Sequence, residues 1–428
     1  MNIRQAATFR RIGFTVAGML AAATFLFTFG HFQPSRVHAQ GTLGSPLPGL
    51  TTGQLNAFNI GFAQFNVTWD PVKGLGPVFT QNDCGTCHST PVPGGTNSTL
   101  RTTFFGKTNP DGTFNPLIEE GGIVLQNQTA SKFIKGCPIP REHIPPDATI
   151  VAQRVPPDLF GLGLVDAIAD QDIINNAVDK GMGIHGVVNM VPDWNGTLRP
   201  GRYGNKAQLA SLVQAVGTAF LIDIGITNPV DLVEECSNAA PGTCTIPPNC
   251  LKAREPNDPN GKVTIQIFDY VVYLAPNPPL GGHDRGQALF SSVGCDLCHN
   301  PSYTTQPDVK VPTNFTGGTT QVVTALSNQP VNLYSDLLLH NLGPKLADNI
   351  QLGQATGSLW RTTPLWGLST RTVYLHDGRT NDLKTAIEDH FSRGNSIYPD
   401  SEANQVITNF NALSPDDQNE LIAFIDSL

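Results

Sequence analysis

Two short motifs constrain this chain more than any other feature of its sequence. Each contains two cysteines separated by two residues and followed directly by a histidine. The motifs are Cys84-Gly85-Thr86-Cys87-His88 and Cys295-Asp296-Leu297-Cys298-His299. Two thiols one turn apart can add to the two vinyl groups of a haem, and the histidine then presents an imidazole to the iron. The pattern predicts two covalently bound c-type haems, with His88 and His299 as proximal ligands.

A zinc site is the alternative interpretation of a Cys-x-x-Cys pair. It would need further cysteine or histidine pairs at ligand spacing, and the sequence offers none. We therefore interpret both motifs as haem attachment sites. The opposite face of each iron then decides the function, because a second strong ligand favours electron transfer whereas an open face admits a small substrate.

Methionine, a common second ligand in electron-transfer cytochromes, is scarce in this chain. The four methionines are Met1, Met19, Met182 and Met190, and all of them precede the second motif. The second haem therefore has no methionine ligand from its own part of the chain. The candidates for this ligand are His340, His376 and His390, with tyrosines as a further option.

The N-terminus has the pattern of a secretory leader. Arg4, Arg10 and Arg11 precede an apolar run over residues 12–30, and Val37-His38-Ala39 is a suitable site for signal peptidase. We predict a signal peptide over residues 1–39, a mature chain that starts near Gln40 in the periplasm or cell envelope, and no integral membrane association after cleavage. An uncleaved membrane anchor is the alternative, because the apolar run is nearly long enough to span a bilayer.

The mature chain is predicted to be acidic. The whole chain has a net charge of -9, and the leader carries four arginines and no acidic residue, so cleavage leaves -13. Such a surface repels nucleic acid and anionic membranes, which excludes both as partners.

Four cysteines lie outside the two motifs. They are Cys137, Cys236, Cys244 and Cys250. In an oxidising compartment an even number of remaining cysteines predicts two disulfides, and the sequence leaves all three possible connectivities open.

The fold class follows from composition and periodicity. The chain has 42 glycines and 34 prolines, which favours long irregular loops. Residues 90–116 and 300–332 are expected to be surface loops. Helical patterns occur at residues 55–65, 166–178, 206–222, 263–274, 285–290, 383–391 and 415–425. Asp284 is the expected N-cap of the helix that leads into the second motif.

We therefore predict a mostly α fold with two tandem cytochrome c-like haem domains and long irregular loops. The predicted N-terminal haem domain covers residues 40–275, and the predicted C-terminal haem domain covers residues 276–428. The linker between them is the Pro- and Gly-rich segment 276–284.

Several longer motifs resemble those of a known family. They are Leu75-Gly76-Pro77, Arg154-Val155-Pro156-Pro157-Asp158-Leu159-Phe160-Gly161-Leu162-Gly163-Leu164, Gly201-Arg202-Tyr203-Gly204, Asp336-Leu337-Leu338-Leu339-His340, Trp360-Arg361-Thr362-Thr363-Pro364-Leu365-Trp366-Gly367 and His376-Asp377-Gly378-Arg379. Together they resemble the di-haem thiol-oxidoreductase-like family of bacterial envelope proteins. That family is related to the di-haem cytochrome c peroxidases and to the di-haem enzyme that matures the tryptophan quinone of methylamine dehydrogenase.

The resemblance implies a ligand for the second haem. In the peroxidases a His-Asp-Gly turn precedes a helix whose end supplies a methionine ligand, and here His390 stands at that position after His376-Asp377-Gly378. It implies a bis-histidine second haem, unless His390 is a surface residue. His376 is expected to contact a haem propionate or to hold its turn.

The resemblance also implies a site for peroxide at the first haem. The peroxidases have a helix that presents a glutamine and, about ten residues later, an acid. Gln214 and Asp223 occupy these places, where they would orient and protonate peroxide, and Arg202 would stabilise negative charge. The alternative is that Gln214 and Asp223 are ordinary helix residues.

The implied function is that of a peroxidase-like oxidoreductase. Electrons would come from a small redox donor protein or a quinol-linked cytochrome, enter at the His299 haem and reach peroxide, or another small oxidant, at the His88 haem. Tyr203 and Asn205 stand where family members often have a relay aromatic, and the turn at Thr362 resembles one contributor to a calcium site. A non-enzymatic electron carrier and a thiol oxidoreductase are the alternatives.

Overall fold

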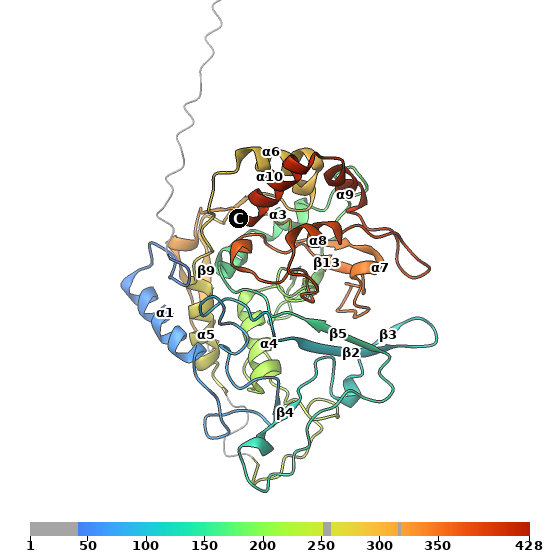
Figure 1. Cartoon of the computed structure of the whole chain (residues 1–428). Coiled ribbons are helices and arrows are strands. Elements are labelled where there is room, and N and C mark those ends of the chain that lie inside the picture. Colours follow the sequence, from blue (N-terminus) through green and yellow to red (C-terminus); the bar gives the residue numbers. More distant parts are fainter. Residues whose placement is uncertain (1–41, 251–257, 316–317) are drawn as a thin grey trace, which may run out of the picture. The chain divides into compact units, whose positions relative to one another are not determined.

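Both helices and strands contribute to this protein, and neither makes up a majority of the residues that the structure describes. The computed structural model describes residues 42–250, 258–315 and 318–428 (Figure 1). Helix makes up 28% of them and strand 14%. The prediction of a mostly α fold is therefore wrong, and the class is mixed. The predicted leader, residues 1–39, and the predicted new N-terminus at Gln40 lie outside the described residues.

The helices within the described residues are mostly short. They are α1 (Thr52–Phe65), α2 (Leu162–Asp166), α3 (Asp170–Asn175), α4 (Leu212–Ile224), α5 (Lys262–Tyr273), α6 (Asp284–Val293), α7 (Gly343–Leu346), α8 (Leu383–Glu388), α9 (Asn404–Asn411) and α10 (Pro415–Asp426).

Side-chain caps explain where the main helices begin. Thr51 and Gln54 form a reciprocal capping box at the start of α1, and Ser211 accepts a hydrogen bond from the Gln214 amide at the start of α4. Gly225, at a φ of 71°, ends α4 in the left-handed conformation that glycine adopts without strain. The sequence prediction began this helix at residue 206, six residues too early, because the Ser211 cap stops it from extending further back.

Two other helix predictions need correction. The predicted helix 166–178 is divided, because α2 ends at Asp166 and α3 begins only at Asp170. The predicted N-cap of α6, Asp284, is its first helical residue, and His283 holds the cap position without a side-chain hydrogen bond.

The strands are short and pair antiparallel across long stretches of sequence. They are β1 (Val78–Phe79), β2 (Thr102–Thr108), β3 (Phe114–Asn115), β4 (Gln128–Thr129), β5 (Ile150–Arg154), β6 (Met190–Pro192), β7 (Leu198–Pro200), β8 (Tyr303–Thr304), β9 (Lys310–Pro312), β10 (Thr320–Val322), β11 (Pro330–Val331), β12 (Leu339–Asn341) and β13 (Leu359–Arg361). β3, β2 and β5 form one sheet in that order, and the other sheets in the described residues have two strands each. Several of these strands lie in segments 90–116 and 300–332, which the sequence analysis expected to be loops.

The larger hydrophobic core is built around α5, which packs against α1, α2 and α4 (Figure 1). Phe268, Tyr270 and Tyr273 of α5 are fully buried. A Cβ at Gly61 of α1 would lie 2.1 Å from the Gln266 carbonyl oxygen of α5. Only glycine therefore allows these two helices to approach so closely.

A second core lies where α6 packs against α10. Phe290 meets Tyr334 and Phe424 edge to face, with ring centroids 5.9 and 5.5 Å apart. The first core includes Trp366 and several side chains between residues 303 and 338, all of which belong to the predicted C-terminal domain. The second core includes Ile184, which belongs to the predicted N-terminal domain. The predicted domain boundary at 275/276 stays a prediction.

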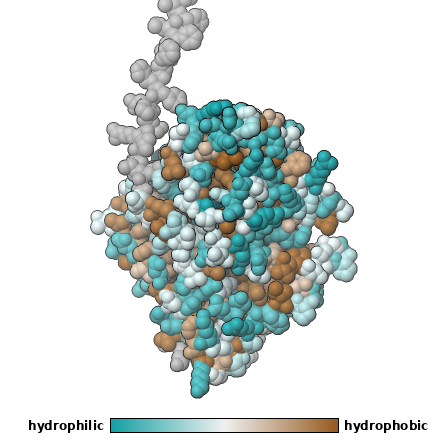
Figure 2. All heavy atoms as spheres, in the orientation of Figure 1, coloured by the Kyte–Doolittle hydropathy of each residue, from teal (hydrophilic) through white to brown (hydrophobic). Residues whose placement is uncertain are grey.

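The surface carries no large segregated apolar face in the view of Figure 2, where hydrophilic and hydrophobic residues are interspersed. In the part of the chain that the structure describes, no helix is both long and apolar enough to cross a membrane.

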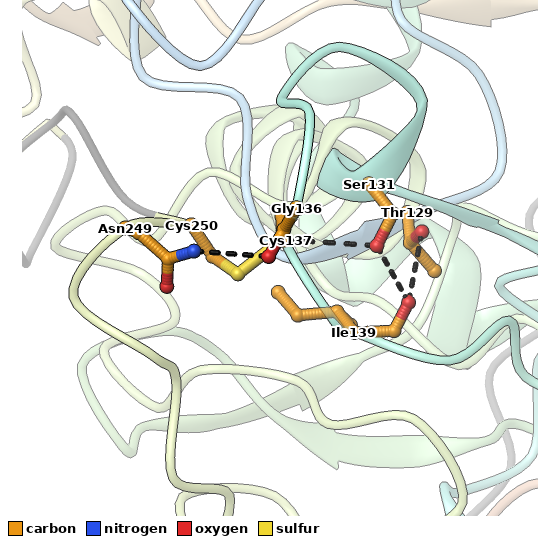
Figure 3. The surroundings of a disulfide bond; sticks show 7 residues. All are labelled: Thr129, Ser131, Gly136, Cys137, Ile139, Asn249 and Cys250. Atoms are coloured by element: carbon orange, nitrogen blue, oxygen red, sulfur yellow. Dashed lines mark hydrogen bonds between the residues drawn. A yellow bond between two sulfur atoms is a disulfide. The ribbon is translucent and has the colours of Figure 1, made fainter.

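The four cysteines outside the motifs lie in two pairs. Cys137 pairs with Cys250, 113 residues away, and Cys236 pairs with Cys244, eight residues away. Figure 3 shows that Asn249 donates to the Gly136 carbonyl beside the first pair, at 3.0 Å. The longer disulfide therefore ties two distant loops together.

The two disulfides should differ in their effect on stability. In the chain-entropy model, a closed loop of 113 residues lowers the free energy of the folded state relative to the unfolded state by about 5 kcal/mol, against about 2.5 kcal/mol for eight residues. We expect Cys137→Ala/Cys250→Ala to lower the free energy of unfolding more than Cys236→Ala/Cys244→Ala. Urea unfolding of both double variants, matched for haem content, measures the difference, and equal losses would contradict it.

Candidate functional site

The first Cys-x-x-Cys-His motif is folded into a single turn. The Cys84 carbonyl accepts hydrogen bonds from the Cys87 and His88 amides, at 3.2 and 3.0 Å. The Asp83 carboxylate accepts from the backbone and hydroxyl of Thr86, at 2.6 and 2.8 Å. These local bonds hold both thiols and the histidine at one site.

The His88 imidazole is fixed by the backbone. Its Nδ1 lies 3.2 Å from the Gly95 carbonyl oxygen, so this nitrogen carries the hydrogen and Nε2 is left free to bind a metal. Burial lowers the pKa of His88, which favours the neutral ring that metal ligation requires.

A cavity of about 110 Å³ opens beside this motif. Its walls come from α1, α4, α5 and the segment before α2, and most of its lining side chains are apolar: Phe65, Leu159, Leu162, Leu212, Ala215, Val216, Ala219, Phe220, Ile224, Ile267 and Val271. The polar lining consists of Gln81, Asp83 and Asp223 together with the motif itself. Among these described residues there is no second histidine and no methionine.

Asp223 is the acid that α4 brings to the cavity. Its side chain is partly buried and its Oδ1 accepts a hydrogen bond from the Thr80 hydroxyl at 2.9 Å. Burial raises the pKa of Asp223 to about 6, although the Thr80 bond opposes the rise. This carboxyl group can therefore exchange a proton near neutral pH, as the sequence-based role requires.

The other two residues predicted for this site do not line the cavity. Gln214 accepts from the Ala210 amide at 2.8 Å and donates to the Pro192 carbonyl at 3.1 Å. Arg202 is buried, donates to three carbonyls between residues 165 and 168, and forms an ion pair with Asp170. Both side chains are held by neighbouring segments of the fold.

The second motif repeats the geometry of the first. The Cys295 carbonyl accepts from the Cys298 and His299 amides, at 3.3 and 2.9 Å. Nδ1 of His299 lies 2.9 Å from the Tyr334 carbonyl oxygen, which again leaves Nε2 free. Burial lowers the pKa of His299 to about 4.

His390 lies close to this second motif. Its Nδ1 bonds to the Ala386 carbonyl of α8 at 2.8 Å, so its Nε2 is also free. His390 is near enough to His299 for its charge to lower the pKa of His299, after the larger effect of burial. His390 follows α8, whose Ile387 packs in the second core with Cys295 and Cys298, while the ligand role of His390 stays a prediction.

The other histidine candidates have different surroundings. Both ring nitrogens of His340 face carboxylate oxygens, of Asp336 at 2.9 Å and of Glu402 at 2.8 Å, so neither is free for iron. His376 stacks on Trp360 with ring centroids 3.7 Å apart, and its carbonyl accepts from the Val155 amide. These contacts agree with the turn-holding alternative for His376, and propionate binding remains untested.

Trp366 packs against the segment that lines the first cavity, and the sequence analysis named it only as part of a family motif. Its ring lies so close to Gly161 that a Cβ there would be 2.8 Å from ring atom Cζ2. Gly161 lies between Leu159 and Leu162, which line the first cavity. On the other side, Leu365 packs in the second core with Cys295 and Cys298. No local pattern reveals this role, because it depends on a contact between residues 205 positions apart.

The donor sets fit haem at both motifs, while a calcium contribution from the Thr362 turn stays a prediction. Each motif offers two thiols and one free imidazole nitrogen in apolar surroundings. The Thr362 carbonyl, by contrast, already accepts from Ser335 Oγ at 2.6 Å and from the Arg361 guanidinium at 3.3 Å. Within the described ranges no group of three or more His, Cys, Asp or Glu side chains could hold a metal ion.

Solved structures offer weak likenesses. A structure of hydrazine synthase from Kuenenia stuttgartiensis is 12% identical, with a TM-score of 0.37, and the match covers 96% of this chain and all of that one. A MauG-like protein associated with microbial copper homeostasis is 13% identical, with a TM-score of 0.29, over 63% of this chain and 89% of that one. No curated protein matches the sequence.

A family model gives the decisive comparison. The family described as "Di-haem oxidoreductase, putative peroxidase" matches residues 141–428, about two thirds of the chain. This range includes the second motif, His390 and α4, and it confirms the resemblance drawn from the sequence motifs. The chain therefore belongs to the di-haem oxidoreductase family, whose members carry two haems and are related to peroxidases.

Proposed function

We propose that this chain is an exported, peroxidase-like di-haem oxidoreductase that takes up electrons at its His299 site and reduces peroxide at its His88 site. The observation that carries the proposal is the difference between the two sites. A second imidazole, His390, lies near His299, whereas the cavity beside His88 is lined by apolar side chains and Asp223. Two imidazoles complete the coordination of an iron, and one imidazole leaves a position for a small substrate.

The residues that would hold the two groups follow from the motifs. Cys84 and Cys87 would form thioether bonds at the first site, and Cys295 and Cys298 at the second. When bound, the haems supply one-electron redox chemistry at iron, and the protein supplies orientation and electrostatics.

Proton supply is the task that the chain itself performs at the first site. Reduction of one peroxide to two waters consumes two electrons and two protons. Asp223 lies in the cavity lining, and its pKa of about 6 allows the carboxyl group to give up and regain a proton near neutral pH. Thr80 holds one carboxyl oxygen at 2.9 Å, which orients Asp223. The apolar wall of α4 limits the access of bulk water.

Gln214 and Arg202 support the site indirectly in this proposal. Gln214 fixes the start of α4 through Ala210 and Pro192. Arg202 donates to the Val165 and Ile168 carbonyls and so ties its own segment to the C-terminal end of α2. Their contacts favour a positioning role over the direct roles that the family resemblance implied.

Trp366 is our candidate for the electron path between the two sites. Its ring reaches the segment that lines the first cavity, and its neighbour Leu365 packs beside the second motif. Tyr203, the residue at the family's relay position, instead bonds through its hydroxyl to the Leu162 carbonyl at 2.9 Å. Aromatic rings at such a junction shorten the distance over which electrons pass between apolar sites.

Export and partners complete the proposal. Two disulfides fit an oxidising compartment such as the periplasm. Every cysteine outside the haem motifs lies in one of these pairs, which gives no support to thiol oxidation by this chain. The acidic mature surface favours a basic electron-donor protein.

Haem attachment can be tested by mass. The mature protein should start near Gln40 and carry two covalent haems, because both motifs are complete. Cys295→Ser should weaken or abolish attachment at the second site, whereas the paired variant Cys236→Ser/Cys244→Ser should keep both adducts. Intact-mass spectrometry measures this directly, and fewer than two adducts in the unmodified protein would refute the central claim.

The ligand at the second site can be tested by spectroscopy. His390→Ala should convert the second haem from low-spin to high-spin and leave the first unchanged, because His390 is the predicted ligand and its Nδ1 bond to Ala386 leaves Nε2 for the iron. His340→Gln is the matched control, since both nitrogens of His340 are already bound. Absorption and electron paramagnetic resonance spectra distinguish the two states. A spin change in the His340 or His376 variant alone would show that His390 is not the ligand.

The proton-transfer role can be tested by kinetics. Loss of a proton-transfer group typically slows a reaction by about 10²- to 10⁴-fold, so Asp223→Asn should slow reaction with peroxide by at least about tenfold at unchanged haem content. Asp269→Asn is a matched control, because burial also raises the pKa of Asp269 to about 7, yet it does not line this cavity.

Stopped-flow measurements of the half-reduced protein separate the outcomes. An Asp223→Asn rate equal to that of the unmodified protein would remove Asp223 from the mechanism. A comparable loss in Gln214→Leu would return Gln214 to the direct role that the sequence suggested. Absence of any reaction with peroxide in the unmodified protein would favour a non-enzymatic electron carrier.

A further inference from the structure

Four charged side chains form a buried network beside the second motif. Asp336 Oδ2 lies 2.7 Å from Lys180 Nζ and 2.9 Å from His340 Nε2, and Glu402 Oε2 lies 2.8 Å from His340 Nδ1. The exposed fractions of these side chains are 13% for Lys180, none for Asp336, 3% for His340 and 17% for Glu402. The network contains two potential cations and two carboxylates.

The hydrogen-bond pattern determines the charge on His340. Carboxylate oxygens only accept hydrogen bonds, so both ring nitrogens must carry hydrogen and the ring is an imidazolium. Burial lowers the pKa of His340, but hydrogen bonds to Asp336, Cys298 and Glu402 raise it, and the net result is above its ordinary value. Bonds to His340 and Lys180 likewise lower the pKa of Asp336 to about 2, against the effect of burial.

Both cations touch the second motif directly. Nδ1 of His340 lies 3.7 Å from Cys298 Sγ, and Lys180 Nζ donates to the Leu297 carbonyl at 2.7 Å. Asp336 contacts the same turn, because its amide donates to the Cys298 carbonyl at 2.9 Å. His340 and Asp336 are near enough to His299 to change its pKa in opposite directions.

The network joins segments from distant parts of the sequence. Glu402, just before α9, also accepts from the backbone amides of His185 and Gly186 and from Asn341 in β12. A Cβ at Gly186 would lie 2.6 Å from His340 Cε1, so glycine is required for the loop to cover the ring. The loop over residues 180–186 is therefore fixed against the second motif by charge.

Stability alone is a weak explanation for such a network. Removing charges from water is costly, and hydrophobic replacements of buried ion pairs are often equally stable. His340 also has no free nitrogen for ligation. Fixed charges in low-dielectric surroundings do, however, act strongly on a nearby redox centre.

We propose that Lys180, Asp336, His340 and Glu402 set the reduction potential of the His299 site. A cation near the iron favours the reduced, less positive state, so Lys180 and His340 raise the potential while Asp336 and Glu402 lower it. These four are positioning residues, because they act through the Cys298 turn and bind no substrate. The inference rests on the proposed haem at Cys295 and Cys298.

Spectroelectrochemical titration of single variants of the full-length holoprotein tests the signs. Lys180→Met and His340→Gln should each lower the midpoint potential of the second haem, and Glu402→Gln should raise it. Each lost charge should change the equilibrium constant for reduction by roughly tenfold, about 59 mV for a one-electron couple. The first haem should not respond. Lys107→Met, which breaks the pair of Lys107 in β2 with Asp147, is the control and should leave both potentials unchanged.

A merely structural network would behave differently. The inference would be overturned if removing a cation and removing an anion moved the midpoint potential in the same direction. It would also be overturned if no variant that still binds a low-spin second haem showed a change in that potential. Lys180→Met is the decisive variant if His340→Gln fails to fold, because Lys180 lies nearest to solvent of the two cations. An unmodified protein that lacks the second covalent haem would instead overturn the proposed function itself, and the inference with it.

Discussion

A hydrogen bond from each proximal histidine to a backbone carbonyl determines what the two sites can do. His88 is fixed by Gly95 and His299 by Tyr334, so each ring presents the same nitrogen to its site. The tautomer and the ring orientation both follow from this single bond. The chain after each motif must therefore hold the accepting carbonyl in position. Backbone hydrogen bonds do this around Gly95 after the first motif and around Tyr334 after the second.

The two sites diverge because different elements face them. Helix α4 presents apolar side chains and ends in Asp223 at the first site, whereas α8 ends near His390 at the second. The same local motif therefore has an open cavity in one place and a second imidazole in the other. Trp366 packs in the first core against Gly161, and its chain neighbour Leu365 packs in the second core.

Sequence reasoning succeeded where the determining interactions are local. The turn at each motif and the helix at α5 depend on spacing along the chain. The fold class was wrong because β2 pairs with β5 about 48 residues later, and most of the other strands have only two or three residues, too few for the two-residue alternation of a strand to be detected. The roles expected of Gln214 and Arg202 came from the family resemblance, which does not determine the partners of a side chain; their hydrogen bonds go to neighbouring segments, and their roles stay predictions.

Charged side chains form several ion pairs in the interior of this protein, although charged residues are few in its composition. Charged residues make up only 14% of the chain, yet Arg154 with Asp348, Arg202 with Asp170 and Lys180 with Asp336 form ion pairs in which at least one side chain is buried. Long Gly- and Pro-rich connections have few ladder hydrogen bonds to define their paths. A buried ion pair has few alternative partners, so it specifies one arrangement of such loops even where it adds little stability. In a protein built around two redox sites, the same fixed charges also supply a permanent electric field.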